Sequence, residues 1–329
     1  MDCEKKIILS VENLCKYFPI YSKGFFAKIS GYVKAVDDVS FDLFEGETIG
    51  LVGESGCGKT TAARTILRAL TPTSGKIILK TNGISVDLAD LSESHLKALR
   101  PKMQMIFQDP FSSLNPRMTI GNIVGEPLII HKMAKKREML DKVKQILVRV
   151  GLSSEHLNRY PHAFSGGQRQ RIGIARALIM NPSLIIADEA VSALDVSVQA
   201  QVLNLLMDLQ KEFNLTYIFV SHNLGVVRYI CNRVAVMYAG KIVEIASTEK
   251  LFENPLHPYT QMLLSAIPHP DPDIKLVVKQ AGEIADITSL PDGCKFYPRC
   301  SFRSSDCLCN SMQLKKIDDD HFVACPLKS

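Results

Sequence analysis

One glycine-rich stretch, GESGCGKT at residues 53–60, constrains this chain more than any other part of its sequence. It follows an apolar run at 48–51 and precedes a segment at 62–70 that has the pattern of a helix. The stretch satisfies G-x-x-x-x-G-K-[ST], in which glycines let successive backbone N–H groups converge on an anion. A chance match in a turn is the alternative, and the strand before and the helix after it count against that reading. The stretch predicts a loop that binds a nucleoside triphosphate.

Several parts of this loop have an expected role. The helix that begins near Gly58 points its positive dipole end at the phosphates, and Lys59 would reach the β- and γ-phosphates. The Thr60 hydroxyl would hold Mg²⁺. The residues expected to contact the nucleotide are Gly53, Glu54, Ser55, Gly56, Cys57, Gly58, Lys59, Thr60 and Thr61.

Composition and charge exclude several classes of protein. The 329 residues are 46% hydrophobic and 22% charged, which is ordinary for a globular chain with one large domain and a smaller one. No apolar run approaches the roughly 18 residues of a membrane span, and the N-terminal stretch lacks the apolar core of a signal peptide, so we expect a cytoplasmic protein. The net charge of +5 is mild, and the basic run KKR at 135–137 is interpreted as a solvated helix face. We therefore expect no nucleic-acid partner.

Strand and helix signals alternate along the chain and predict an α/β core. Apolar runs at 183–190 and 216–222 are typical of buried parallel strands with a helix between them, and the helical block upstream of them is interpreted as an inserted subdomain. Two N-terminal stretches, 6–14 and 33–43, alternate partly between apolar and polar residues and predict antiparallel strands. The role of the insertion between them, 19–33, stays open, with a surface hairpin as the default.

Polar residues stand at the ends of the expected strands. Asp188 and Glu189 end an apolar strand, where Asp188 can bind Mg²⁺ through its water shell and Glu189 can polarise an attacking water. The amide of Gln108 could coordinate Mg²⁺ and water, and His222 could contact the γ-phosphate. Taken alone, each would be an ordinary solvated strand end or cap. The phosphate loop upstream favours the catalytic interpretation.

The most specific element is FSGGQRQRIGIARAL at 164–178. Ser165 suits a helix N-cap, and Gly166 and Gly167 expose backbone N–H groups at the positive end of that helix, which makes a second anion site. One chain would therefore have two phosphate-binding helix ends but only one set of carboxylates. The two ends would close on one nucleotide if two such chains met head to tail.

These motifs, with SALD at 192–195, resemble the nucleotide-binding subunits of ABC transporters in order and approximate spacing over residues 1 to about 250. The resemblance implies a P-loop NTPase fold, the ABC nucleotide-binding domain, with an antiparallel β subdomain and a helical subdomain at about 109–180. It also implies a sandwich dimer that holds ATP between the phosphate loop of one subunit and the second anion site of the other. The residues that would act on the partner's ATP are Ser165, Gly166, Gly167, Gln168 and Asp195.

The resemblance also assigns the residues that would contact the nucleotide bound to the same chain. Besides Lys59, the residues carried over are Thr60, Gln108 and Asp188 for Mg²⁺, and Glu189, His222 and Gln108 for catalysis. An aromatic is expected to stack on adenine; Phe18 is the first choice and Tyr17 the alternative, and either could instead be a core residue of an edge strand.

One departure from the family is visible after the catalytic-type glutamate. Many members have proline and threonine where this chain has Ala190 and Val191. Since Glu189 is kept, we expect hydrolysis to survive, while inferences that depend on the stiffness of that turn are in doubt.

Longer stretches resemble the peptide-importer branch, whose members carry dipeptides, oligopeptides or nickel complexes. Examples are FQDPFSSLNPRMTIGNIVGEPL, EAVSALDVSVQAQVLNLL and the tail ENPLHPYTQMLLSAIP. The resemblance implies a peripheral subunit at the cytoplasmic face of the inner membrane that hydrolyses ATP to power import. The expected domains are an ATP-binding domain at 1–255 and a C-terminal extension at 256–329. Frequent prolines from 257 onward predict an extended connector.

The same resemblance implies partners. These are two transmembrane permeases, an extracytoplasmic solute-binding protein that acts indirectly, and a second ATPase subunit. The tail and the EAVSALD variant resemble one member of a two-ATPase pair, so we expect a paralogue and hence a heterodimer. The rival from another class is an ABC ATPase of a non-transport complex, such as one for phosphonate breakdown.

Cysteines gather in the C-terminal extension. Cys294, Cys300, Cys307 and Cys325 have the spacing C-x5-C-x6-C-x17-C, with Cys309 as an extra. A cytosolic location argues against disulfides, and four thiolates suit either tetrahedral zinc or an iron–sulfur cluster. The resemblance to peptide-importer ATPases, carried by GCKFYPRC and the later DC and AC, implies a [4Fe–4S] cluster with a structural role; zinc and free thiols are the alternatives.

Overall fold

The structure is a computed structural model, and it describes residues 6–22, 28–81, 83–267, 290–309 and 312–327. The chain divides into two compact units. The first unit comprises Phe44–Glu47 and Asp90–Val220, and the second unit comprises Lys6–Leu43, Thr48–Ala89 and Ser221–Ser329. Within the described ranges, every helix is too short or too polar to cross a lipid bilayer.

Three parallel strands form the sheet of the first unit. They are β6 (Met103–Ile106), β7 (Leu184–Asp188) and β8 (Thr216–Ser221), with β7 paired to both neighbours. Every residue of β7 and β8 is buried, which is why both read as continuous apolar runs rather than as alternating patterns. The prediction of buried parallel strands with a helix between them is confirmed.

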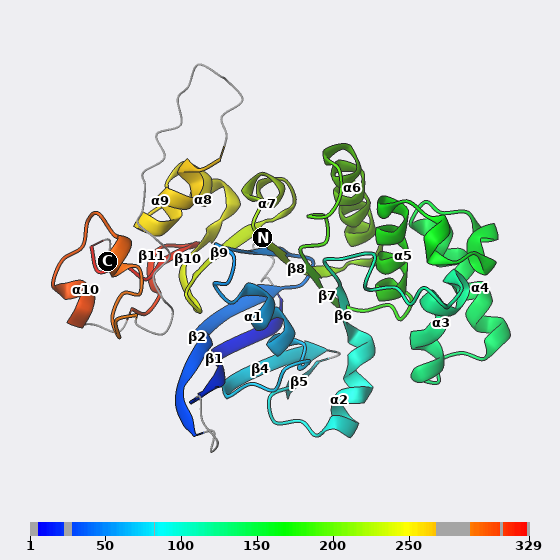
Figure 1. The fold of residues 1–329 in the computed structure, drawn as a ribbon, viewed down its shortest axis with the longest axis horizontal. Helices are drawn as coiled ribbons and strands as arrows, with labels where there is room; N and C mark the ends of the chain where they lie inside the picture. The colour runs from blue at the N-terminus through cyan, green and yellow to red at the C-terminus, as the bar shows by residue number, and fades with distance from the viewer. Residues whose placement is uncertain (1–5, 23–27, 82, 268–289, 310–311, 328–329) are drawn as a thin grey trace. The chain divides into compact units, whose positions relative to one another are not determined.

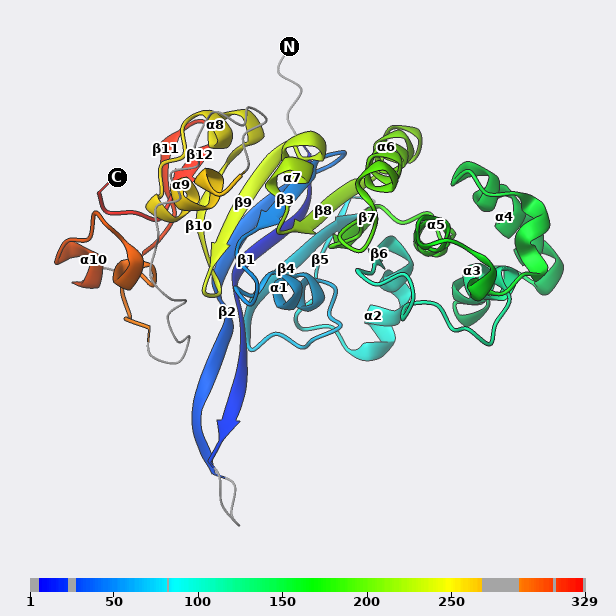
Figure 2. The same ribbon diagram turned by 45° about the horizontal axis from the view of Figure 1, so that its top comes forward.

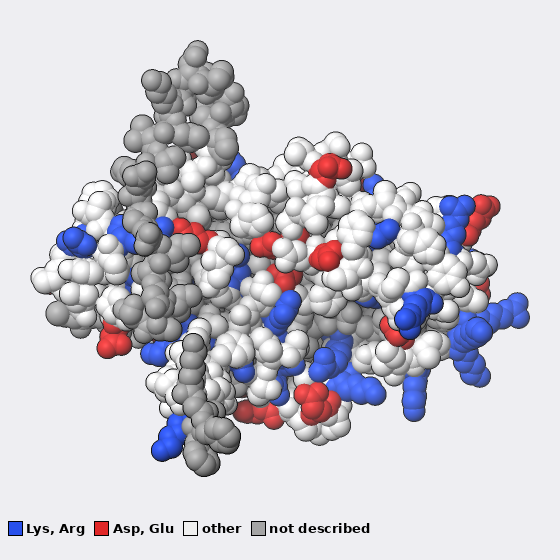
Figure 3. Space-filling model, in the orientation of Figure 1, with Lys and Arg blue, Asp and Glu red and all other residues white. Residues whose placement is uncertain are grey.

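Helices make up the rest of the first unit. They are α2 (Glu93–Leu99), α3 (Ile120–Ile130), α4 (Lys136–Arg149), α5 (Gly166–Leu178) and α6 (Val196–Phe213), with short 3₁₀ turns at Arg100–Lys102, Ser154–Asn158 and Pro161–Ala163. Helices α3, α4 and α5 pack on one another (Figure 1). In α4 the buried residues Met139, Val143, Ile146 and Leu147 repeat at helical spacing. The basic run at 135–137 is exposed, as predicted, and Figure 3 shows blue side chains gathered over α3 and α4.

A four-stranded sheet forms one layer of the second unit. Its order is β2-β1-β4-β5, with β1 (Ile7–Tyr21), β2 (Ile29–Phe44), β4 (Ser74–Thr81) and β5 (Ile84–Asp87). β1 and β4 are antiparallel, and the buried Leu9 pairs with the buried Leu79. In Figure 2, β1 and β2 extend together as a long ribbon. The flanks of the insertion at 19–33 therefore continue these two strands, in keeping with a hairpin, while 23–27 lie outside the described residues.

A second group of strands in this unit is connected to three helices, and the first of these along the chain follows the predicted phosphate loop. β3 (Thr48–Val52) runs parallel to β9 (Arg233–Tyr238), and β9, β10 (Lys241–Ser247), β12 (His321–Val323) and β11 (Lys315–Asp318) follow as antiparallel neighbours. The helices are α1 (Lys59–Ile66), α7 (Leu224–Ile230) and α8 (Thr248–Glu253). Since β12 pairs with β10, the C-terminal extension is joined to this sheet by backbone hydrogen bonds. Parallel and antiparallel strands with helices agree with the predicted α/β class.

The C-terminal extension is more ordered than its prolines suggest. It contains α9 (Pro258–Ser265), a 3₁₀ turn at Tyr297–Arg299 and α10 (Asp306–Cys309). The predicted extended connector is wrong for α9, because Pro258 occupies the first helical position, where its missing N–H costs nothing. The remainder of that connector, 268–289, lies outside the described residues. The boundary at residue 255 stays a prediction.

A buried carboxylate anchors the extension to β10. Glu244 is fully buried and accepts hydrogen bonds from the backbone N–H groups of Leu256 and His257. His321 Nε2 lies 2.6 Å from the same carboxylate. A buried carboxylate is costly unless its oxygens are all satisfied, so these contacts hold both ends of the extension in one place.

Candidate functional site

The predicted phosphate loop connects β3 to α1 in the second unit. Gly53 and Gly58 have φ angles of 149° and 108°, which favour glycine. A Cβ added at Gly53 would lie 2.2 Å from Met237 O, and one at Gly58 would lie 2.1 Å from Ala35 O. The loop backbone therefore packs against its neighbours with no room for side chains at these two positions.

Lys59 is held inside this loop. Its ammonium donates to Gly53 O at 2.8 Å and to Glu54 O at 2.9 Å, and the residue is 5% exposed. Ser55 and Gly56 are exposed at the tip of the loop. Burial raises the pKa of the Cys57 thiol, so this side chain stays neutral beside the lysine. The loop backbone therefore holds in place the cation that is predicted to meet the phosphates.

The structure adds two contacts to this loop that the sequence did not suggest. The Glu54 backbone N–H donates to the Tyr259 hydroxyl at 2.8 Å. The Glu54 carboxylate accepts two hydrogen bonds from Arg299, at 2.8 and 2.9 Å. Both partners come from the C-terminal extension. In the sequence, the Glu54–Arg299 contact has one local signal, the arginine that flanks the cysteines in GCKFYPRC.

The candidate catalytic residues of the first unit meet at the end of β7. Asp188 is 2% exposed, and the next residue, Glu189, has a φ of 47°, a region that non-glycine residues seldom occupy. The Glu189 N–H donates to Val220 O at 2.9 Å. Its carboxylate accepts from Gln108 Nε2 at 2.7 Å. The two residues predicted to handle the attacking water are therefore in contact.

The second predicted anion segment begins α5. Ser165 Oγ accepts from the Gln168 N–H at 3.4 Å, and Gln168 Oε1 accepts from the Ser165 N–H at 3.0 Å. This reciprocal pair is a capping box. The predicted N-cap is confirmed, and both side chains are exposed. A Cβ at Gly167 would lie 2.4 Å from Val198 Cγ1, so α6 requires glycine there.

The remaining predicted residues are distributed over both units. Asp195 is the N-cap residue of α6 in the first unit, and His222 follows β8 as an exposed residue of the second unit. Phe18 is 37% exposed, with Lys16 Nζ 5.0 Å from its ring centroid. Tyr17 instead donates to Asp37 Oδ1 at 2.8 Å, and burial raises its pKa. Of the two candidates for adenine stacking, Phe18 offers the more open ring.

The cysteines of the C-terminal extension lie near one another. Cys294 N–H donates to Cys307 O at 2.7 Å. Burial, together with charge repulsion from Cys307, Cys325 and Cys300, raises the pKa of Cys294 to about 11. No group of three or more Cys, His, Asp or Glu side chains in the described part of the chain is arranged to hold a metal ion. The structure therefore brings these thiols near one another but does not arrange them as metal ligands.

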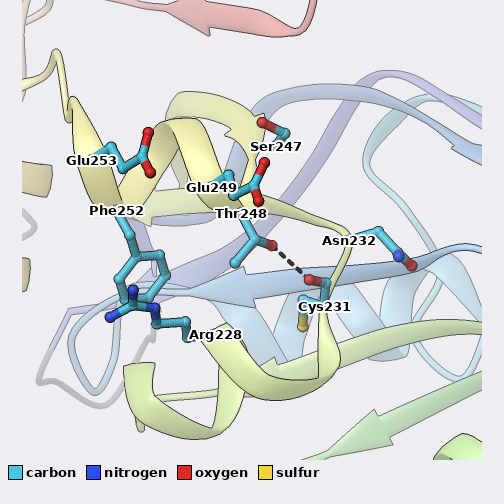
Figure 4. Close-up of a pocket in the computed structure, with 8 residues that line it drawn as sticks. All are labelled: Arg228, Cys231, Asn232, Ser247, Thr248, Glu249, Phe252 and Glu253. Atoms are coloured by element: carbon cyan, nitrogen blue, oxygen red, sulfur yellow. Dashed lines mark hydrogen bonds between the residues drawn. The ribbon is translucent and has the colours of Figure 1, made fainter.

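A surface pocket of about 430 Å³ lies elsewhere in the second unit (Figure 4). Its lining includes Arg228, Phe252, Glu249 and Glu253. The Arg228 guanidinium carbon lies 5.4 Å from the ring centroid of Phe252. Thr248 Oγ1 donates to Cys231 O at 2.6 Å in the pocket wall. None of the predicted site residues lines it, and its mixed charges indicate no particular ligand.

Two family models match the chain. Residues 36–192 match the ABC transporter family, and residues 243–307 match the family described as oligopeptide/dipeptide transporter, C-terminal region. The second match covers α9, Lys295, Arg299 and most of the cysteines. The segment that contacts the phosphate loop therefore lies inside the match to the oligopeptide/dipeptide transporter family and outside the match to the ABC transporter family.

Similar proteins extend over the whole chain. The oligopeptide transport ATP-binding protein AppF of Bacillus subtilis (strain 168) is 52% identical over 331 residues, covering 99% of this chain and 98% of that protein. OppF of the same organism is 51% identical and covers 92% of this chain and 93% of that protein. Neither name supports the non-transport alternative.

Solved structures agree with the fold. The ATP-binding cassette MJ0796, in a dimeric post-hydrolysis state bound to ADP and Pi, is 28% identical, with a TM-score of 0.62, covering 73% of this chain and 98% of that chain. The cbiO1 protein of Clostridium perfringens, part of the ABC transporter complex cbiONQ, is 26% identical with a TM-score of 0.63, covering 76% and 92%. The predicted fold class is confirmed. The chain belongs to the ATP-binding proteins of ABC transporters, in the oligopeptide and dipeptide branch.

Proposed function

We propose that this chain is the ATP-hydrolysing subunit that powers import of dipeptides or oligopeptides through an ABC transporter. The observation that carries the proposal is the phosphate loop. Its backbone closes so tightly that Gly53 and Gly58 admit no side chain, and it holds the Lys59 ammonium on two of its own carbonyls. A fixed cation within a ring of backbone groups suits a triphosphate, whose charge is the main feature to be stabilised.

The residue roles follow from the same chemistry. Lys59 and the loop N–H groups bind the phosphates, and Phe18 stacks on adenine. The oxygen donors Thr60, Gln108 and Asp188 suit Mg²⁺, which when bound neutralises charge on the phosphates.

Catalysis is assigned to Glu189, with His222 as the contact to the γ-phosphate. The hydrogen bond from Gln108 supports this assignment, because it fixes the carboxylate that orients the attacking water.

The subunit acts as one half of a dimer. Ser165, Gly166, Gly167, Gln168 and Asp195 serve the ATP bound to the partner. The exposed end of α5 supports this role, because Ser165 and Gln168 satisfy one another and both lie at the surface of the first unit. A paralogous ATPase is the proposed partner, and two permeases receive the motion at the cytoplasmic face of the membrane. A solute-binding protein delivers the peptide.

A metal site in the C-terminal extension is a separate part of the proposal. Its support is the chemistry of the residues, because Cys294, Cys300, Cys307 and Cys325 supply four neighbouring thiols, the donors that such a site uses. An iron–sulfur cluster with a structural role is proposed first and zinc second. Anaerobic purification followed by ultraviolet–visible spectra and metal analysis separates them. Brown protein with iron and sulfide supports the cluster, whereas colourless protein with stoichiometric zinc, or with no metal, contradicts it.

Hydrolysis is tested by a change of one atom. Glu189→Gln keeps the hydrogen bond to Gln108 but removes the base, so phosphate release should fall by about 10²- to 10⁴-fold while ATP binding persists. The control is Glu155→Gln, the same change on an exposed glutamate of the first unit. Equal turnover in wild type and Glu189→Gln contradicts the assignment.

Import is tested in cells. Deleting the gene for this chain should abolish uptake of labelled di- and oligopeptides, and the wild-type gene but not Lys59→Ala should restore it. Unchanged peptide uptake contradicts import and favours the non-transport alternative.

A further inference from the structure

We propose that the C-terminal extension completes the phosphate loop, with Arg299 and Tyr259 as positioning residues that act on ATP binding through Glu54. The inference rests on the phosphate-binding role proposed above for residues 53–61. It concerns residues of the second unit only, so every contact lies within one compact body.

The first contact is an ion pair with fixed geometry. Arg299 donates from both terminal nitrogens to the two oxygens of the Glu54 carboxylate, at 2.8 and 2.9 Å. Its side chain is 7% exposed and that of Glu54 is 24% exposed. The guanidinium also lies 5.8 Å from the ring centroid of Tyr238 and 5.7 Å from that of Phe296. A bidentate pair held between aromatic rings fixes orientation as well as charge.

The second contact fixes a single peptide group of the loop. The Glu54 N–H, held by the Tyr259 hydroxyl, and the Gly53 carbonyl, which accepts from Lys59, belong to the same peptide plane. Tyr259 is fully buried, and its ring packs on Tyr238 with the centroids 4.6 Å apart. Because a peptide group is planar, holding its N–H also sets the direction of its carbonyl. The extension thereby determines where the Lys59 ammonium sits.

A second cation of the extension supports the turn behind the loop. Lys295 donates to Ala239 O at 2.8 Å and pairs with Asp37 at 2.8 Å. The neighbouring Gly240 N–H donates to Cys57 O at 2.8 Å, inside the phosphate loop. Lys295 and Arg299 both lie between Cys294 and Cys300, so one short segment contacts the loop from two sides.

The charge of Glu54 makes the pair matter for nucleotide affinity. An unpaired carboxylate at the start of the loop would repel the triphosphate, and Arg299 neutralises it where solvent reaches little of either group. A merely structural role would lower the melting temperature without changing the affinity of the folded protein for ATP. A positioning role changes that affinity, and removal of the carboxylate restores it.

The experiment is a double-mutant cycle on the full-length chain. The dissociation constant of a fluorescent ATP analogue and the Tm are measured for wild type, Arg299→Met, Glu54→Gln and the double variant. We expect Arg299→Met to bind about tenfold more weakly, and the double variant to recover to within about threefold of wild type. The matched control is Arg303→Met, because Arg303 is in the same extension but contacts Tyr297 and the Pro298 carbonyl instead.

Two milder variants keep the test decisive if Arg299→Met does not fold. Tyr259→Phe removes only the hydroxyl, and Arg299→Lys keeps the charge but not the bidentate geometry; each should weaken binding by about threefold or more. Wild-type affinity in all folded variants, or a double variant as weak as Arg299→Met, overturns the inference. Lys59→Ala separates the two proposals. If it binds ATP as wild type does, the phosphate-binding role fails. If it loses binding while Arg299→Met does not, only the role of the extension fails.

Discussion

Two helix N-termini of this chain carry the predicted anion-binding segments, and they differ in how the first turn of the helix is capped. Helix α1 follows Gly58, which has a φ of 108° and no side chain with which to cap the helix. Helix α5 follows Ser165, which forms a reciprocal capping box with Gln168. The first N-terminus therefore has no side-chain cap, whereas the second satisfies part of its own hydrogen bonding with a capping box.

The two segments also differ in burial. Lys59 is 5% exposed and Gly53 and Gly58 admit no Cβ, so the phosphate loop is preorganised within one chain. Ser165 and Gln168 are exposed at a finished helix end. The difference teaches that the phosphate loop can select its ligand alone, while the α5 segment needs a second body to make a closed site. The head-to-tail dimer proposed above would supply that body.

The largest effect is expected from a substitution in the phosphate loop. Gly58→Ala places a Cβ 2.1 Å from Ala35 O at a left-handed backbone position, so we expect a loss of about 3 kcal/mol in the free energy of unfolding and no measurable ATP binding. Gly56→Ala is the matched control. It also has a positive φ, but its Cβ would meet nothing within 4 Å, so about 1 kcal/mol is expected.

Denaturant unfolding and nucleotide titration measure both variants. Equal losses in Gly58→Ala and Gly56→Ala would mean that backbone conformation alone, and not the close approach of the Ala35 carbonyl, sets the requirement for glycine.

An intermediate effect concerns a third helix N-terminus, that of α9, which supports the phosphate loop through Tyr259. Its cap is His257, whose Nδ1 accepts from the Tyr259 N–H at 3.1 Å, so the ring must be neutral there. Burial lowers the pKa of His257 to about 3. The unfolded chain binds this proton below a pH of about 6.5 and the folded chain does not. Stability is therefore complete above pH 6.5 and is lost as the pH falls toward 3.

The expected loss from this group is about 2 kcal/mol between pH 7.5 and pH 5. His257→Asn keeps a capping oxygen without a titratable ring, so the difference between the two proteins isolates His257 from other acid-sensitive groups. Parallel stability curves for wild type and variant over this range would show that the histidine does not stay neutral in the fold.

The smallest effect is expected from removal of the side-chain cap of α5. Ser165→Ala removes the cap of α5 and should cost about 1 kcal/mol of stability. Ser247→Ala is the matched control, since Ser247 Oγ accepts from the Lys250 N–H at 3.4 Å, the same distance as in the Ser165 cap.

Both serine variants should bind ATP as monomers like wild type, but only Ser165→Ala should lose ATP-dependent dimerisation with the proposed partner ATPase in the Glu189→Gln background. Size-exclusion chromatography with light scattering measures this. Equal dimerisation of the two variants would reduce Ser165 to a simple helix cap.

Much of the fold could be predicted because the signals are local. The buried strands β7 and β8 read as apolar runs, and the residues of the capping box at α5 lie three apart in the sequence. The connector at Pro258 was mispredicted, because proline ends a helix from inside but is well accommodated at its first position. Proline thus fits either an extended segment or the start of a helix. The sequence did not distinguish these two structures, whereas the packing of the extension on Glu244 did.

The sequence by itself determined the phosphate loop, the capped α5 segment and the polar residues at strand ends, since glycine spacing and strand periodicity act over a few residues. Only the tertiary structure decided that Glu54 meets Arg299, a residue 245 positions later in the chain. Neither charge is unusual in its own surroundings, and a long-range ion pair leaves no local pattern. The partner of the phosphate loop was settled by how the extension folds back along β10, where a buried carboxylate and a short strand hold it.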